Sequence, residues 1–302
     1  MASTSDSVQP GVPASAISHS EYNTGQVMPV NTELRFKYVQ EITPEQSNYQ
    51  NMNEISFLID GRENVWTDLN NLEMEISLKM KKRNGSGALE NFADDVYQPA
   101  FPENNLFNSI WEKVEFEVQG NTVRTEGNYA IRCYFDAICN YDESEARAME
   151  ISEGFFPTAE GEDITHGPVG LTGDASTKSA NAHAHPSIAR RQAQLTRNSE
   201  EFTLLGRLRG DLADQGKMLI PGTDLRIKLT KNKPEFVCRA KDVEPVLEIV
   251  NMTLKVKRAI LQDSVEAIYR SALHARKLAS YPIHRKTVSQ RIVPKGTNIT
   301  MD

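Results

Sequence analysis

The stretch Leu72-Glu-Met-Glu-Ile-Ser-Leu-Lys-Met-Lys81 alternates apolar and polar side chains at every step. Successive side chains of a β-strand point to opposite faces, so this period predicts a strand with one buried face and one solvated face. An α-helix would distribute the same apolar residues around its circumference. The stretch therefore predicts a sheet that is covered on one side.

The same alternation recurs along the chain and predicts further strands. Their apolar residues are Leu34, Phe36 and Tyr38; Ile55, Phe57 and Ile59; Val114, Phe116 and Val118; Leu225, Ile227 and Leu229; and Val246, Val250, Met252, Leu254 and Val256. Gln119-Gly120-Asn121 follows one of these strands and predicts a hairpin, because glycine adopts positive φ without steric cost. After a long break in the pattern, strands are expected to resume at 201–205.

Two segments have the period of a helix instead. Their apolar stripes are Ile131, Tyr134, Phe135 and Ile138, and Val265, Ile268, Tyr269 and Ala272. The second helix is expected to begin at Asp263 with a capping box to Glu266, and to end near Ser280, ahead of Pro282. A short helix is also expected over 186–198.

Many strands with long connections and a few inserted helices predict an all-β protein, an antiparallel sandwich or jelly roll. The absence of regular strand–helix alternation argues against a doubly wound α/β sheet. Residues 1–30, rich in Ser, Pro, Ala and Gly, predict a flexible N-terminal arm, and 31–302 the jelly-roll domain. A long loop excursion is expected around 141–200, where 141–174 hold nine acidic residues against one base, Arg147.

Composition limits the classes of function. The 302 residues are 39% hydrophobic and 25% charged, enough for a packed core, and the net charge of −7 argues against a general nucleic-acid binder. No run approaches the length of about 18 apolar residues, so no membrane span is expected. The three cysteines, Cys133, Cys139 and Cys238, favour a reducing compartment over a disulfide framework. Cys133 and Cys139 are expected to be buried structural thiols.

His183 and His185 are the most plausible ligands for a metal ion. Some jelly-roll enzymes hold a metal with two histidines at this spacing and a carboxylate soon after, but here Pro186 follows and the next acid is Glu200. A solvated loop is therefore favoured. The chain has no Walker A sequence, no Gly-x-Ser-x-Gly and no His-Glu-x-x-His. No catalytic residue and no cofactor are predicted.

The C-terminal segment carries four bases and no acid between 281 and 295: Arg285, Lys286, Arg291 and Lys295. The favoured interpretation is a solvated strand edge, since cations on edge strands suppress unwanted pairing. The alternative is a basic face toward a partner or toward nucleic acid, in weak contact. A contact of this segment with the acidic loop of a neighbouring subunit is a further hypothesis.

Five blocks of sequence, in this order and spacing, resemble capsid proteins of Polinton/Maverick elements and their adintovirus relatives. They are 105–123, similar to a short helix followed by a hairpin; 128–141, similar to the next helix; 202–212; 218–230, similar to a strand pair; and 279–285. The resemblance covers roughly residues 30–295. It implies a viral jelly-roll capsid protein with no catalytic residues.

The resemblance also implies partners and a location. The chain would be a major or a minor (penton) subunit that assembles with copies of itself and other capsid proteins into an icosahedral shell. It would reside in the virion, and in the host cytoplasm or nucleus before assembly. Related chains often continue past Tyr281-Pro-Ile into a double jelly roll, so the resemblance implies one barrel of that architecture, a shortened product, or a single-barrel minor component.

Two other functions stay open at this point. One is a jelly-roll metalloenzyme that uses His183 and His185. The other is a β-sandwich module that binds carbohydrate or protein, which would present an exposed aromatic platform. The chain has only two tryptophans, Trp66 and Trp111, and Trp111 is expected to be buried.

Overall fold

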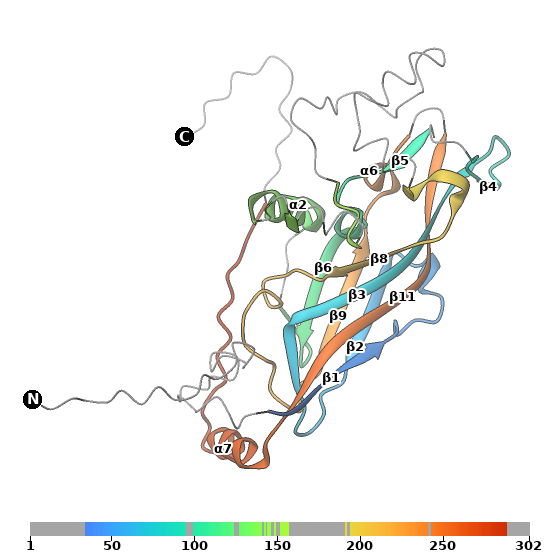
Figure 1. Ribbon diagram of the computed structural model, residues 1–302. Helices are drawn as coiled ribbons and strands as arrows, with labels where there is room; N and C mark the ends of the chain where they lie inside the picture. The colour runs from blue at the N-terminus through green and yellow to red at the C-terminus, as the bar shows by residue number, and fades with distance from the viewer. Residues whose placement is uncertain are drawn as a thin grey trace, which may run out of the picture.

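Two antiparallel sheets packed face to face form the body of the protein (Figure 1). The computed structural model describes residues 34–94, 99–123, 127–140, 142, 144–145, 148, 152–156, 191, 194–240 and 243–288. The predicted all-β class with a few inserted helices is confirmed. The N-terminal arm predicted for 1–30 and most of the excursion predicted for 141–200 lie outside these residues.

The first sheet has the strand order β1-β11-β3-β8, with the short β4 paired to the far end of β3. Its strands are β1 (Leu34–Ile42), β3 (Trp66–Arg83), β4 (Leu89–Asn91), β8 (Phe202–Arg207) and β11 (Glu244–Leu261). The second sheet has the order β2-β9-β6-β7. Its strands are β2 (Glu54–Ile59), β6 (Trp111–Val118), β7 (Asn121–Val123) and β9 (Leu225–Lys231). A separate pair joins β5 (Ala100–Pro102) to β10 (Cys238–Ala240).

The pairing of the strands is nested. β1 pairs with β11, β2 with β9, β3 with β8 and β6 with β7, each pair antiparallel. The nested pairs correspond to one long antiparallel hairpin. Successive pairs of this hairpin belong alternately to the first and the second sheet, so the hairpin is wrapped around the core. The eight strands of these four nested pairs, divided between two sheets, make a jelly roll, which confirms the predicted fold class.

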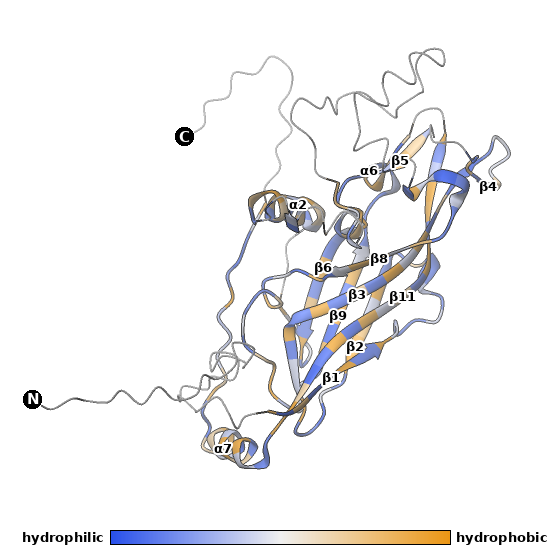
Figure 2. Ribbon diagram, in the orientation of Figure 1, coloured by the Kyte–Doolittle hydropathy of each residue, from blue (hydrophilic) through white to orange (hydrophobic). Residues whose placement is uncertain are grey.

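The core lies between the sheets. Figure 2 shows apolar and polar residues alternating along β3. The whole apolar set predicted for this strand is inaccessible to solvent: Leu72, Met74, Ile76, Leu78 and Met80. The sets predicted for β2 and β9 are equally buried, and Trp111, Phe57, Phe107 and Phe116 fill the space between the sheets. Full burial of one such side chain contributes about 1.5–3 kcal/mol, so this layer holds the sheets together.

The hairpin predicted at 119–121 is confirmed. Val118 pairs with Asn121, so the turn between β6 and β7 contains two residues, Gln119 and Gly120. Their φ angles of 49° and 77° are both positive. This is the type I′ pattern, whose twist matches that of the flanking strands.

The predicted burial patterns of two strands are wrong. In β11, Val250 is 37% exposed, whereas Ile249 is buried. The pairing with β3 shifts register between Ile249 and Asn251, and this bulge reverses the face on which alternate side chains lie. In β1 the strand is confirmed, but Phe36 is 49% exposed, because β1 is an edge strand beside a second register shift.

Among the elements whose bounds fall in the described ranges, the α-helices at the ends of the sandwich are α1 (Leu106–Ser109), α2 (Tyr129–Asn140), α6 (Pro234–Val237) and α7 (Asp263–His274). The 3₁₀ helices η3 (Tyr49–Asn51) and η4 (Arg197–Ser199) accompany them. η4 overlaps only the end of the short helix predicted over 186–198, most of which lies outside the described residues. Of the helices in the described ranges, none is both long and apolar enough to cross a membrane.

Helix α7 begins at Asp263 as predicted, but the predicted capping box between Asp263 and Glu266 does not form. Its N-cap is Gln262, without a side-chain hydrogen bond. The Glu266 carboxylate instead accepts a hydrogen bond from Trp66 Nε1 at 3.1 Å. The helix ends at His274 rather than near Ser280, and Arg276 just beyond it has a φ of 58°. A left-handed residue at this place terminates a helix.

Candidate interaction surface

Helix α2 buries the face opposite to the predicted one. Tyr129 and Cys133 are at most 1% exposed, whereas Phe135 and Ile138 of the predicted stripe are 55% and 54% exposed. The buried face consists of the smaller residues Ala130, Cys133 and Ala137 together with Tyr129. Small side chains let the helix lie close to α1 and β6, so the larger apolar residues are left facing outward.

Ion pairs on one flank hold α2 in this orientation. Arg132 is 5% exposed, and its Nη1 lies 2.9 Å from Asp211 Oδ1 while its Nη2 lies 3.2 Å from Asp214 Oδ2. Asp136 forms an ion pair of 2.9 Å with Lys286. A buried charge needs a partner. Rotating the helix to bury its larger apolar stripe would separate Arg132 from the carboxylates of Asp211 and Asp214.

The hydroxyl of Tyr129, at the start of α2, is hydrogen-bonded on two sides. The Tyr129 hydroxyl accepts a hydrogen bond from the Arg209 backbone N–H at 3.1 Å and donates to Asn108 Oδ1 at 3.3 Å. Burial raises the pKa of Tyr129 well above its usual value. Burial also raises the pKa of the Cys133 thiol to about 12, so this thiol stays protonated at neutral pH. These groups support the fold rather than a reaction.

Residues 152–156 run beneath α1 and α2. The Phe107 N–H donates to the Glu153 carbonyl at 3.0 Å, and Leu106 N–H donates to the Gly154 carbonyl at 3.3 Å. The Glu153 side chain is itself buried, and Asn108 Nδ2 donates to its carboxylate at 3.4 Å. Burial raises the pKa of Glu153 to about 7. This segment thus places a titratable carboxyl inside the protein.

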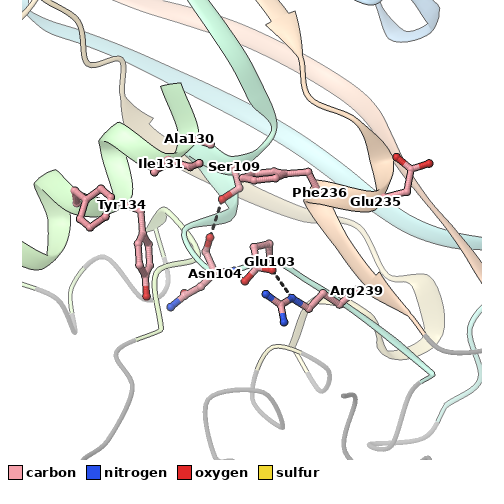
Figure 3. Close-up of a pocket in the computed structure, with 10 residues that line it drawn as sticks. Glu103, Asn104, Ser109, Ala130, Ile131, Tyr134, Glu235, Phe236 and Arg239 are labelled. Atoms are coloured by element: carbon pink, nitrogen blue, oxygen red, sulfur yellow. Dashed lines mark hydrogen bonds and ion pairs between the residues drawn. The ribbon is translucent and has the colours of Figure 1, made fainter. Parts of the chain in front are cut away.

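A groove of about 450 Å³ opens between α2 and α6 (Figure 3). We call it the α2–α6 groove, and it is lined by Glu103, Asn104, Ser109, Ala130, Ile131, Tyr134, Phe135, Glu235, Phe236 and Arg239. Figure 3 shows Ile131 and Tyr134 of α2 on one wall and Phe236 of α6 on the other. Phe236 is 37% exposed and Phe135 more so, which leaves an apolar surface open to solvent.

Of the two acidic residues that line this groove, Glu103 is paired with a cation in the described part of the chain and Glu235 is not. Glu103 forms an ion pair with Arg239 at 2.6 Å and lies 3.8 Å from Arg191. Glu235 is exposed, and among the residues that the structure describes no cation pairs with it. The groove therefore combines apolar walls with an unpaired carboxylate. Such a surface suits a short apolar peptide segment that carries a cation.

The basic C-terminal segment is a strap rather than a strand edge, at least up to Val288. It runs without sheet pairing from α7 to α2 (Figure 1). Lys217 Nζ donates to the Ser280 carbonyl at 2.7 Å, and Ile220 N–H donates to the Tyr281 hydroxyl at 3.1 Å. At the far end, Asn128 Nδ2 donates to the Val288 carbonyl at 3.4 Å. The prediction of an edge strand is wrong for this part.

Only some of the predicted site residues can be placed. Arg285 is exposed, and Lys286 is neutralised by Asp136. The other candidates, His183, His185, Arg291 and Lys295, lie outside the described residues. Within the described ranges no group of three or more metal-ligating side chains occurs. Sequence reasoning missed the α2–α6 groove; the small residues of α2 were the signal that its larger apolar stripe faces outward.

The two tryptophans and the cysteines are also located. Trp66 and Trp111 are 2% and 0% exposed, so neither forms an exposed aromatic platform. The expectation that Trp111 is buried is confirmed. Cys133 and Cys238 are buried, but Cys139 is exposed on the last turn of α2, so its predicted burial is wrong.

No protein-family model matches this chain, and no curated protein matches it. Among solved structures, the mavirus major capsid protein is similar at 13% identity and a TM-score of 0.45, covering 86% of this chain and 53% of that one. A chain of the cryo-EM structure of the Sputnik virophage is similar at 14% identity and 0.46, covering 85% and 53%. The Faustovirus major capsid protein is similar at 9% identity and 0.44, covering 82% and 58%. The chain thus spans about half the length of the structures it matches.

Proposed function

We propose that the protein is a structural subunit of an icosahedral viral shell and not an enzyme. The observation that supports this most directly is the nested strand pairing of a jelly roll whose interior is packed with side chains. Jelly rolls occur in viral capsid proteins, lectins and cupins. A ligand site between the sheets needs open space there, whereas Phe57, Trp111 and Phe116 occupy it.

A shell subunit requires stiffness and repeated contacts rather than reactive groups. Two sheets sealed by a large apolar core supply the stiffness. Closed symmetry then repeats each subunit contact many times, so modest contacts give a stable assembly. The two ends of the sandwich, which carry α2 with α6 and α7 with β1, supply exposed apolar side chains for such contacts (Figure 1).

Four of the five sequence blocks that resemble Polinton/Maverick and adintovirus capsid proteins coincide with elements of the fold, and the fifth, 279–285, lies in the strap. The block 105–123 holds α1 followed by the β6–β7 hairpin, and 128–141 holds α2. The block 218–230 holds β9, preceded by a single bridge of Leu219 to Thr67. This agreement supports our proposal that the chain is related to that group, as a single barrel or as one barrel of a double jelly roll.

We assign its partners accordingly: copies of itself and other capsid proteins, in the virion and, before assembly, in the host cytoplasm or nucleus. Residues 1–30 act in this proposal as an arm that orders on assembly. Packaged nucleic acid remains a weak additional partner for Arg285, Arg291 and Lys295. Lys286 contributes little to that contact, since Asp136 neutralises its charge.

Electron microscopy and light scattering of the expressed chain test the proposal, with the chain alone and with candidate co-subunits. Capsomers or closed particles are the expected result. A protein that stays strictly monomeric under all of these conditions would overturn it.

The metalloenzyme alternative is tested by metal analysis of the purified protein. Stoichiometric Fe, Mn or Zn that is lost in the His183→Ala/His185→Ala double variant would also overturn the capsid role. The matched control is the His274→Ala/His284→Ala double variant, which removes the same number of histidines from α7 and the strap.

A further inference from the structure

The outward face of α2 is an apolar surface without a cover among the described residues. Ile131 and Tyr134 are partly buried in the α2–α6 groove, while Phe135 and Ile138 are more than half exposed. Phe236 extends this surface across the groove. Contiguous exposed apolar residues on a soluble domain mark a contact site.

The strap delivers the C-terminal residues directly to this face. Lys286 is fixed on α2 by its ion pair with Asp136, and the Val288 carbonyl accepts a hydrogen bond from Asn128, the residue before the helix. Residue 289 therefore starts beside the first turn of α2. Any short segment that follows is held at high effective concentration next to the apolar face.

The distances allow the next few residues to cover the helix. From Asn128 to Ile138, α2 advances about 15 Å at 1.5 Å per residue. An extended segment of six residues spans about 20 Å. Residues 289–294 are thus long enough to follow the helix to its last turn.

The chemistry of this segment matches the surface. It contains the apolar run Ile292-Val293-Pro294, flanked by the cations Arg291 and Lys295. The groove offers apolar walls and the unpaired Glu235. The C-terminal end of α2 also favours cations, because the helix dipole is negative there.

We propose that residues 289–302 dock in cis against the outward face of α2 and the α2–α6 groove, with Ile292 and Val293 as the apolar contacts. The occupant is the chain's own C-terminal segment and not that of a second copy, since Val288 is already anchored on the same helix. The contact forms in the isolated subunit, so it does not depend on the proposed shell.

Cys139 provides a native probe for this contact. It is exposed on the last turn of α2, whereas Cys133 and Cys238 are buried and have thiol pKa values raised to about 12. In a Thr297→Cys variant, mild oxidation at low protein concentration is expected to form a disulfide between Cys139 and the introduced thiol within one chain. Mass spectrometry and a non-reducing gel identify the bond and its monomeric state, and Cys139→Ser removes it.

Two further variants decide whether the cross-link reports docking or mere proximity. Ile292→Asp/Val293→Asp in the tail, or Phe135→Ser on the exposed face, is expected to slow cross-linking at least tenfold. Ser289→Asp/Gln290→Asp adds the same charge outside the apolar run and is the matched control, with little change expected. Equal rates in all variants, or disulfide-linked dimers as the main product, would overturn the proposal.

Discussion

Asn104 and Phe156 are joined by two reciprocal hydrogen bonds, although 52 residues separate them. Asn104 Nδ2 donates to the Phe156 carbonyl at 2.8 Å, and the Phe156 N–H donates to Asn104 Oδ1 at 2.7 Å. The side-chain amide thus pairs with the Phe156 backbone much as a neighbouring strand would. Both groups are buried, so this pair fixes residues 152–156 beneath α1 and α2.

Replacing Asn104 with alanine should destabilise the protein by about 2–4 kcal/mol, because it removes both buried hydrogen bonds to the Phe156 backbone. Urea denaturation measures the free energy of unfolding. The matched control is Asn53→Ala, at an exposed position, which should change this free energy by less than about 0.5 kcal/mol. Equal effects of the two substitutions would show that the reciprocal pair contributes nothing.

Glu153 should make the stability depend on pH. Burial raises the pKa of its carboxyl from 4.5 to about 7 in the folded protein. Between these two values the folded state binds more protons than the unfolded state, so the contribution is complete below about pH 4.5 and is lost as the pH rises through 7. A change of this size corresponds to about 3 kcal/mol.

The Glu153→Gln variant should remove this dependence, because glutamine stays neutral. Urea titrations between pH 4.5 and 8 should show the variant gaining stability relative to the wild type as the pH rises. Glu112→Gln, at an exposed position of β6, controls for the loss of one carboxylate. A constant difference between Glu153→Gln and wild type over this range would contradict the prediction.

The strands were predictable because their signal is local. The alternation in β3 is read from neighbouring residues, and burial against the opposite sheet follows from it. The same interpretation failed in β11 at one point, because the bulge at Val250 changes which side chains point toward the core. A bulge depends on the partner strand, so the sequence of β11 alone does not reveal it.

The orientation of α2 was not predictable from its hydrophobic period. The helix has two candidate faces, one with larger apolar residues and one with smaller ones. Which face is buried depends on Arg132 and its partners Asp211 and Asp214, which lie far away in sequence. The α2–α6 groove follows from that choice, and for this reason the candidate interaction surface emerged only with the structure.

The turn between β6 and β7 gives a prediction about backbone conformation alone. Gly120 has a φ of 77°, and a Cβ added there would meet nothing within 4 Å. Gly120→Ala should therefore cost about 1 kcal/mol through the left-handed conformation and not through a clash. Gln119→Asn should stabilise by about 0.5 kcal/mol, since asparagine adopts positive φ more readily.

Thermal or urea unfolding measures both changes. Gly85→Ala is the control, because its added Cβ also meets nothing within 4 Å and no positive φ is involved. A similar loss for Gly85→Ala and Gly120→Ala would contradict the conformational argument.

Arg258 and Arg62 both contact Asp60, and substituting each should have a very different effect. The Arg258 side chain is fully buried, and Asp60 Oδ1 lies 3.3 Å from its Nη2. The Arg258 guanidinium also donates to the Asp60 carbonyl at 2.9 Å and to Gln40 Oε1 at 3.0 Å, and it contacts Thr67 Oγ1. It thus ties β11 to β1, to β3 and to the end of β2.

Arg258→Leu places an apolar side chain at this buried position and removes all of these hydrogen-bond donors. The free energy of unfolding should fall by about 3 kcal/mol or more, because several acceptors at the end of the sandwich lose their partner together. Arg62→Ala removes a solvent-exposed ion pair with the same carboxylate and an exposed contact with Tyr38, and it should leave the urea midpoint unchanged within error. If the two variants unfold at the same urea concentration, the buried guanidinium is not what joins the two sheets at this end, and the apolar core alone holds them.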